Sequence, residues 1–251
     1  MKNYSLKFRT IIIFLIIGFV LFPATTFAVK LYFEPESGEY HLGEIFIEKI
    51  EIDTEGECIN VVEAYLSFSQ DILNAVDFSQ GESILTLWVK APTINQIKGE
   101  ISFIGGIPGE YCGIIPGDPG QSNLLGKIIF KVSETVTKNL AEVQFLDNSQ
   151  VLLSDKLGTK AKLTTKGATF RILAEKIEVP ENQWQQELKK DTILPEPFEI
   201  IISQHSSIFE GKYFIIFFTT DKQTGVDYYE VKEGDREWKL AESPYLLEDQ
   251  S

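Results

Sequence analysis

The chain has 251 residues, with 37 acidic side chains against 23 basic ones and a formal net charge of −14 at pH 7. A protein that binds nucleic acid neutralises phosphates with clustered Lys and Arg, and no such cluster follows the N-terminal segment. The composition therefore excludes a nucleic-acid partner, and we expect the acidic surface to keep the protein soluble.

The first 28 residues are typical of an export signal. Lys2, Lys7 and Arg9 precede an apolar run over residues 11–22. This run is short for a bilayer that needs about 20 apolar residues, which favours a signal peptide cleaved after Ala28. An uncleaved N-terminal anchor is the alternative. Removal of the signal takes away three positive charges and no acidic ones, which changes the net charge from −14 to −17. We expect a secreted or extracellular protein associated with the cell surface.

Cys58 and Cys112 are the only two cysteines. In an exported chain an even count predicts a disulfide, and with two cysteines the pairing is unique. Such a bridge closes a loop of about 54 residues, and we expect it to stabilise the fold by about 3 to 4 kcal/mol. Two buried free thiols are the alternative.

From residue 30 onward, short apolar or alternating runs are separated by turn residues about every ten positions, which is typical of a β-sandwich or barrel. The apolar parity changes within residues 45–52, which predicts a β-bulge near Glu48 and Lys49. The Gly- and Pro-rich stretch 105–120 is expected to be an irregular surface loop. The clearest alternation covers residues 62–68. Further strands are expected over residues 31–33, 84–89, 99–104, 124–132, 141–146, 151–153 and 167–173.

The composition changes after residue 174, which ends a first β module over 30–174. Residues 175–197 are polar and contain three prolines, which predicts a linker that has room for a short helix. Residues 198–251 return to β signals with four expected strands, too few for an independent sandwich. We interpret this segment as a partial Ig-like module. We expect the native chain to continue beyond Ser251, as a route of attachment to the cell surface.

The order and spacing of several segments within residues 30–173 resemble a cohesin domain, which is a nine-stranded jelly-roll sandwich related to cellulose-binding modules. The run 60–68 followed by Asp71-Ile72-Leu73 resembles the family's third strand and its turn. Cys58, Cys112 and the long Gly/Pro loop depart from the common pattern. The other similar segments are 43–46, 99–103, 124–132 and 167–170.

The resemblance implies an all-β fold and a non-catalytic module that binds a dockerin-like protein module or, through the wider superfamily, a polysaccharide. In known cohesins the partner lies across one sheet face. The strands that correspond to this face are about 60–68, 86–90, 100–104 and 141–146, and no individual contact residue is carried over. A structural or adhesive stalk module without a ligand pocket is the alternative function.

Side chains suited to catalysis are scarce. His41 and His205 fall in different modules and lack metal-ligand spacing, so we expect no catalytic residues, no metal and no other cofactor. Carboxylate pairs leave a glycoside hydrolase as a third alternative. Solvated strand faces are expected to account for the acidic residues on the predicted strands: Glu48, Glu51, Glu63 and Glu100.

Trp88 is the candidate for stacking on a ligand. It shares parity with Thr86 and Lys90 on an expected strand, which predicts an outward position. The large apolar face of an exposed indole packs well on a sugar ring. Partial burial beneath the loop at Pro92 is the alternative.

Overall fold

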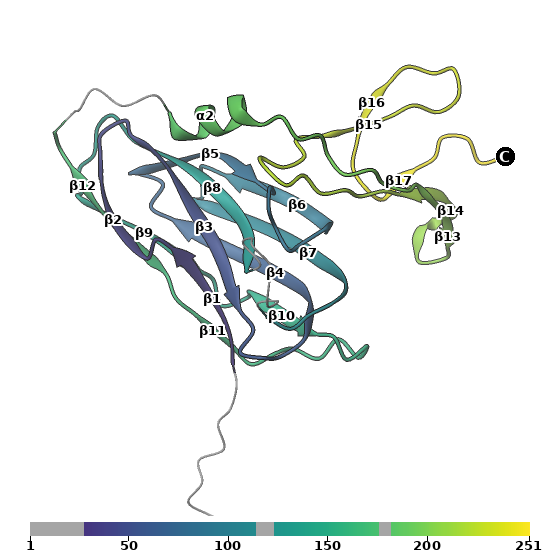
Figure 1. Ribbon diagram of the computed structural model, residues 1–251, viewed down its shortest axis with the longest axis horizontal. Coiled ribbons are helices and arrows are strands. Elements are labelled where there is room, and N and C mark those ends of the chain that lie inside the picture. The colour runs from purple at the N-terminus through teal and green to yellow at the C-terminus, as the bar shows by residue number, and fades with distance from the viewer. Residues whose placement is uncertain (1–27, 114–122, 176–181) are drawn as a thin grey trace, which may run out of the picture.

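The computed structural model describes residues 28–113, 123–175 and 182–251, and Figure 1 shows its arrangement. Two β-sheets form a sandwich, and a smaller β segment follows at the C-terminal end. The predicted all-β sandwich is therefore confirmed. The predicted signal peptide lies outside the described residues. No helix in the described part of the chain is long and apolar enough to cross a membrane.

The smaller sheet has five strands in the order β11-β1-β3-β8-β5. The larger sheet has the order β2-β12-β9-β4-β7-β6, with β10 paired to β4. The bounds in the smaller sheet are β1 Val29–Glu34, β3 Ile45–Asp53, β5 Leu73–Ser79, β8 Leu124–Val132 and β11 Leu163–Thr165. Those in the larger sheet are β2 Ser37–His41, β4 Ile59–Phe68, β6 Leu87–Asn95, β7 Glu100–Tyr111, β9 Leu140–Phe145, β10 Gln150–Leu153 and β12 Ala168–Leu173.

The first strands of the sandwich pair with its last ones. Strand β1 is parallel to β11 in the smaller sheet, and β2 is parallel to β12 in the larger one. Only Pro35 and Glu36 separate β1 from β2, so the chain crosses between the sheets at this point. The strand that follows at once, β2, was not among the strands that the sequence pattern predicted.

Alternate side chains of the strands fill the space between the two sheets. In β4 the residues Val62, Ala64, Leu66 and Phe68 are buried, as the alternation predicted. Burial of a large apolar side chain contributes about 1.5 to 3 kcal/mol relative to exposure. Aromatic rings bridge the two sheets at several points, with ring centroids 4.6 Å apart for Phe33–Phe145 and 5.1 Å apart for Phe46–Phe170.

Strand β3 does not contain the bulge predicted near Glu48 and Lys49. Its even-numbered residues Phe46, Glu48, Ile50 and Ile52 are all buried, so the parity is continuous. The register with β8 shifts later, between Ile50 and Glu51. The prediction was wrong because it assumed that a glutamate faces solvent, and the buried Glu48 made the apolar pattern look interrupted.

Strand β7 also departs from the prediction, because it continues to Tyr111 through half of the expected loop. A Cβ atom at Gly105 would lie 2.6 Å from Leu85 Cδ1, so this position needs glycine for close approach of the strand to a core side chain. The rest of the expected loop, residues 114–120, lies outside the described residues.

The segment expected to be a linker contains helix α2, Gln183–Lys190. The Asn182 side chain caps this helix by accepting from Trp184 N. After it, β13 Ile201–His205, β14 Ile208–Ile216 and β17 Tyr245–Leu246 form one sheet. A separate pair consists of β15 Tyr229–Val231 and β16 Lys239–Ala241.

The C-terminal segment is docked on the sandwich through short contacts at the end of β5. Ser79 Oγ donates to the Thr224 carbonyl at 2.6 Å, and Glu82 N donates to the Asp221 carbonyl at 3.3 Å. The backbones of Gly81 and Gly225 meet here, because a Cβ at Gly225 would lie only 2.6 Å from Gly81 N. Residues 182–197 therefore do not act as an extended tether in this arrangement.

Candidate functional site

The four strands that the resemblance assigned to partner binding are neighbours in the larger sheet, in the order β9-β4-β7-β6. We call their outward surface the β9-β4-β7-β6 face. Tyr65 of β4 lies opposite Ser102 of β7, and Ser102 lies opposite Thr93 of β6. On the other side of β4, Ser67 lies opposite Gln144 of β9. Side chains from all four strands therefore share one continuous surface.

A lysine organises the centre of this face. Lys90 Nζ donates to Ser102 Oγ at 2.9 Å and lies 5.8 Å from the centroid of the Tyr65 ring. Thr93 Oγ1 lies 3.0 Å from the same Ser102 hydroxyl. The cation–π contact and the hydrogen bond favour this position of the exposed Lys90 side chain, and a cation–π contact at a surface contributes about 0.5 to 1 kcal/mol. The face thus presents an aromatic ring, a cation and two hydroxyls beside one another.

Acidic side chains occupy further outward positions along this face. Glu63, Glu100 and Glu142 occupy outward positions of β4, β7 and β9. Glu142 Oε2 accepts from Gln144 Nε2 at 3.1 Å, and the side chains of Glu100 and Glu142 are exposed. The face therefore carries several carboxylates besides Lys90, which favours encounter with a positively charged partner surface.

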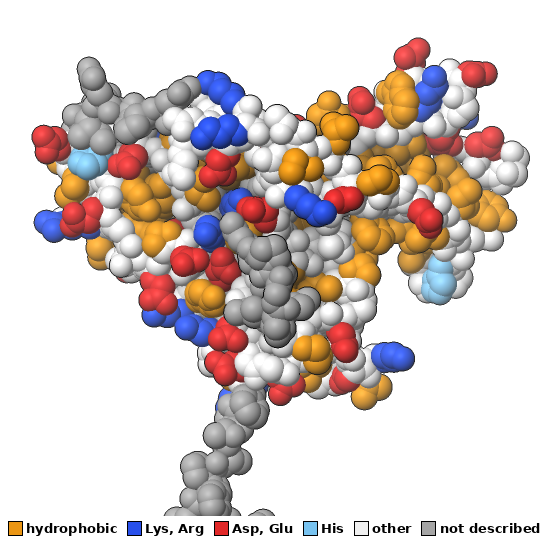
Figure 2. Space-filling model, in the orientation of Figure 1, with side chains coloured by type: hydrophobic (Ala, Val, Ile, Leu, Met, Phe, Trp, Pro, Cys, Tyr) orange, Lys and Arg blue, Asp and Glu red, His pale blue; other side chains and the backbone are white. Residues whose placement is uncertain are grey.

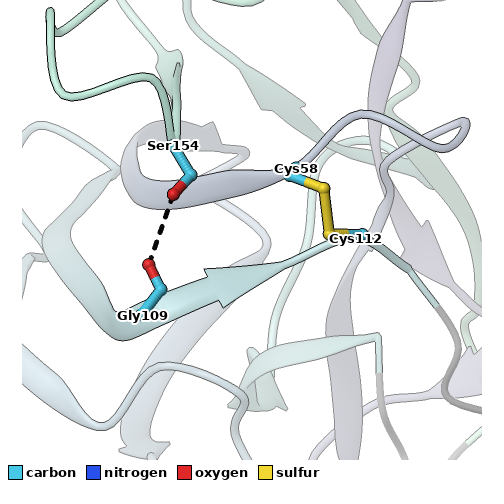
Figure 3. Close-up of a disulfide and its surroundings, with 4 residues drawn as sticks. All are labelled: Cys58, Gly109, Cys112 and Ser154. Atoms are coloured by element: carbon cyan, nitrogen blue, oxygen red, sulfur yellow. Dashed lines mark hydrogen bonds between the residues drawn. A yellow bond between two sulfur atoms is a disulfide. The ribbon is translucent and has the colours of Figure 1, made fainter.

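The predicted disulfide between Cys58 and Cys112 is present at one end of this face (Figure 3). Cys58 precedes β4 and Cys112 follows β7, one position beyond the pair Ile59–Tyr111. Ser154, which follows β10, contacts both strands beside the disulfide. Its N–H donates to the Cys58 carbonyl at 2.8 Å, and its hydroxyl donates to the Gly109 carbonyl at 3.4 Å. The bridge closes the β4–β7 ladder where the two strands separate.

The structure places Trp88 away from this face. Trp88 lies opposite Gly105 and Lys90 opposite Ile104, with a register shift between them. The extra residue turns Trp88 inward, although its parity with Lys90 predicted an outward position. Its ring packs edge-on against Phe103 at 5.6 Å and Phe78 at 6.2 Å between centroids. Trp88 is half-buried, which agrees with the alternative of partial burial, and its packing comes from these core rings.

Comparison with known proteins finds similar folds among cohesins. No protein-family model and no curated protein matches the sequence. The seventh ScaB type I cohesin from Pseudobacteroides cellulosolvens is similar at 14% identity and a TM-score of 0.44, over 62% of this chain and 99% of that one. The third ScaB cohesin from R. flavefaciens, solved with a group 1 dockerin, is similar at 14% identity and 0.44, over 61% and 100%. CaCohA2 from Clostridium acetobutylicum gives 11% and 0.45, over 59% and 92%.

Two carboxyl groups of the sandwich are buried, contrary to the expectation of solvated strand faces. Glu48 is completely buried, and neither of its carboxyl oxygens has a hydrogen-bond partner. Burial, with the charge of Glu34 adding to it, raises the pKa of Glu48 to about 9. Burial and Glu34 also raise the pKa of Glu51 to about 7, against the opposing effect of Lys49. A fully buried Glu48 does not reach a polymeric substrate.

The histidines have local structural partners. His41 Nδ1 lies 3.2 Å from Glu44 Oε2, and His205 Nδ1 accepts from Ser207 N at 3.2 Å. In the part of the chain that the structure describes, one group of side chains has metal-ligand character, formed by Glu110 and the two cysteines. The cysteine sulfurs form the disulfide, so they are not available as the thiolates that bind a metal.

Proposed function

We propose that the chain is an exported, non-catalytic binding module that holds a protein partner of the dockerin type on the β9-β4-β7-β6 face. The arrangement of Lys90 over Tyr65, with the Ser102 and Thr93 hydroxyls beside it, supports this proposal. Tyrosine is one of the residues that most often dominate binding energy in protein interfaces. The mutual contacts of these side chains favour this arrangement before a partner binds, which lowers the entropic cost of association.

The carboxylates of this face and the Tyr65 ring indicate which chemical groups a partner would present. Glu63, Glu100 and Glu142 are complementary to Lys or Arg side chains that approach from solvent. The part of the Tyr65 ring that Lys90 leaves open is complementary to an apolar group. We therefore expect the partner to present a basic side chain beside an apolar one, and we expect its association rate to fall as salt is added.

Surface plasmon resonance with residues 29–251 and a panel of dockerin modules tests the proposal. We expect at least one dockerin to bind, and Tyr65→Ala to weaken its affinity about tenfold or more, since truncation of an interface anchor costs about 2 kcal/mol. Tyr32→Ala is the matched control, because Tyr32 lies under Lys30 in the same way, at 5.0 Å, on the smaller sheet. Absence of binding, or equal losses in both variants, contradicts the proposal.

The alternatives have their own tests. A stalk module without a ligand predicts no saturable binding by any dockerin. A glycoside hydrolase predicts hydrolysis of a polysaccharide that a single carboxylate-to-amide change abolishes. Export is a separate part of the proposal, and N-terminal sequencing of protein recovered from the culture medium is expected to begin at Val29.

A further inference from the structure

A groove of about 520 Å³ lies between strand β6 and the C-terminal segment, within the size range of small-ligand sites. In Figure 2 hydrophobic side chains gather over the C-terminal segment and its junction with the sandwich. We call this site the β6 groove. Strand β6 contributes Leu87, Trp88, Val89 and Ala91, and the C-terminal segment contributes mainly Phe217, Phe218, Val226, Tyr228, Tyr229 and Leu240.

Aromatic rings on both walls are held in place by the fold. Trp88 is fixed by its edge-on contacts with Phe78 and Phe103. On the opposite wall, Tyr229 packs against Phe217 with centroids 5.1 Å apart, and its hydroxyl accepts from Thr219 N at 3.0 Å. Tyr228, the next residue, is 60% exposed. The β6 groove therefore combines rigid aromatic walls with one ring that remains open to solvent.

The polar groups that line the groove indicate the charge and the hydrogen-bonding groups of the ligand that it would bind. Asp227 and Glu242 supply carboxylates, and Ser243 supplies a hydroxyl that accepts from Phe217 N at 3.0 Å and retains its own proton to donate. Among the described residues that line the groove there is no Lys or Arg. The two carboxylates would therefore repel an anionic ligand, and no positive side chain of the lining would offset this repulsion. An apolar side chain placed over these carboxylates would supply no donor to them, and this is unfavourable.

A neutral sugar is complementary both to the aromatic rings and to the carboxylates of the groove. Its hydroxyl groups donate to carboxylates, which form stronger hydrogen bonds than neutral acceptors do. Its C–H faces pack against aromatic rings, which carry a large apolar area. We propose that the β6 groove binds a neutral oligosaccharide, with Trp88 and Tyr228 as stacking residues and Asp227 and Glu242 as acceptors.

This site is separate from the proposed partner surface. Strand β6 contributes to both sites, but Trp88 is turned to the inner side of the larger sheet, and Tyr65, Lys90 and Ser102 of the β9-β4-β7-β6 face do not line the groove. The substitutions that test the two sites therefore fall on different residues. Tyr65→Ala is expected to leave sugar binding unchanged.

Isothermal titration of residues 29–251 with cellohexaose, xylohexaose and mannohexaose tests the inference, and hexagalacturonate serves as the anionic counterpart. We expect at least one neutral hexasaccharide to bind and hexagalacturonate not to bind. Tyr228→Ala is expected to lower the affinity about tenfold. Trp238→Ala is the matched control, since Trp238 is 61% exposed but does not line the groove. Quenching of tryptophan fluorescence that Trp88→Phe removes locates the sugar at Trp88.

Several results overturn the inference. These are no binding of any neutral hexasaccharide, preferential binding of hexagalacturonate, and binding that Tyr228→Ala leaves unchanged. Capture of a hydrophobic peptide in place of any sugar would show that the groove is a peptide site. Trp88→Ala removes contacts with core rings, so Tyr228 and the fluorescence of Trp88 provide the readout instead.

Discussion

The indole N–H of Trp184 donates to a carboxylate oxygen of Asp77 at 3.0 Å and so joins helix α2 to strand β5. The other oxygen of Asp77 accepts from Phe78 N at 2.8 Å, which fixes the acceptor. Trp184 is 6% exposed. The one tryptophan of the segment expected to be a linker is therefore an anchor on the sandwich.

Removal of this anchor is expected to free the helix. Trp184→Ala removes a buried aromatic side chain. Such a truncation in a core usually lowers the free energy of unfolding by about 3 to 5 kcal/mol. Because Trp184 packs on the sandwich from one side only, we expect about half of that loss for the docking of the helix. Hydrogen exchange of residues 183–190 is the measurement. Trp184→Phe is expected to have a smaller effect, because it keeps ring packing and loses only the hydrogen bond. Unchanged exchange in Trp184→Ala would contradict this prediction.

The buried Glu48 predicts an unusual dependence of stability on pH. Its pKa is about 9 in the folded protein against an ordinary value of 4.5. Between these values the unfolded chain binds fewer protons, so the free energy of unfolding falls as pH rises, by at most about 1.4 kcal/mol per pH unit from this group. Glu51 adds to the fall between pH 4.5 and about 7. Urea unfolding at pH 5, 7 and 9 measures the slope.

Two variants separate Glu48 from the other carboxyl groups. Glu48→Gln is expected to flatten the slope, and Glu48→Leu to stabilise the protein at pH 7 by about 1 to 3 kcal/mol, because it removes an unpaired buried polar group. Glu63→Gln, on the solvent-facing side of β4, is the matched control and is expected to keep the slope. A slope that survives in Glu48→Gln would refute this account.

The close approach of the Gly81 and Gly225 backbones predicts that a methyl group added at position 225 weakens the docking of the C-terminal segment. Gly225 has φ +99° and almost touches the Gly81 backbone, so Gly225→Ala is expected to weaken docking of the C-terminal segment. Gly234 has φ +58° with nothing near its missing Cβ, so Gly234→Ala carries only the conformational strain. Faster hydrogen exchange in β13 and β14 for Gly225→Ala than for Gly234→Ala is the expected result, and equal rates would exclude the contact as the cause.

The disulfide predicts a measurable loss of stability on reduction. The bridge spans a sequence separation of 54 residues, for which the loop-entropy model gives about 3 to 4 kcal/mol. The double variant Cys58→Ser, Cys112→Ser is expected to lower the Tm by about 10 °C. A reductant is expected to lower the Tm of the wild type to that of the variant and to leave the variant unchanged. Equal Tm values without reductant would refute the prediction.

Local patterns predicted most strands because one face of each is buried. The alternation over Val62–Phe68 identified β4 and its inner face correctly, and the strands expected to form the partner surface are neighbours. The errors occurred where a side chain broke the assumed rule. Glu48 is charged in water and buried in the protein, and Trp88 changes face because of a register shift against β7. Neither the burial of Glu48 nor the register shift beside Trp88 can be recognised from a single sequence.

The β6 groove and the docking of the C-terminal segment were also beyond prediction. Ser79 and Thr224 are 145 residues apart in the sequence, and no periodicity connects them. The one local signal was glycine, because Gly81 and Gly225 both lie where two backbones meet. A glycine alone does not identify its neighbour, so the contact emerged only from the folded chain.

The parallel pairing of β1 with β11 and of β2 with β12 has a consequence for the order of folding. A chain that emerges from its N-terminus presents β1 and β2 first, while the segments that pair with them arrive more than 120 residues later. Until then, a row of backbone donors and acceptors in each sheet stays open to other chains. A chaperone that binds β1 and β2 during synthesis is therefore expected to raise the yield of folded protein more than a chaperone that binds only the completed chain.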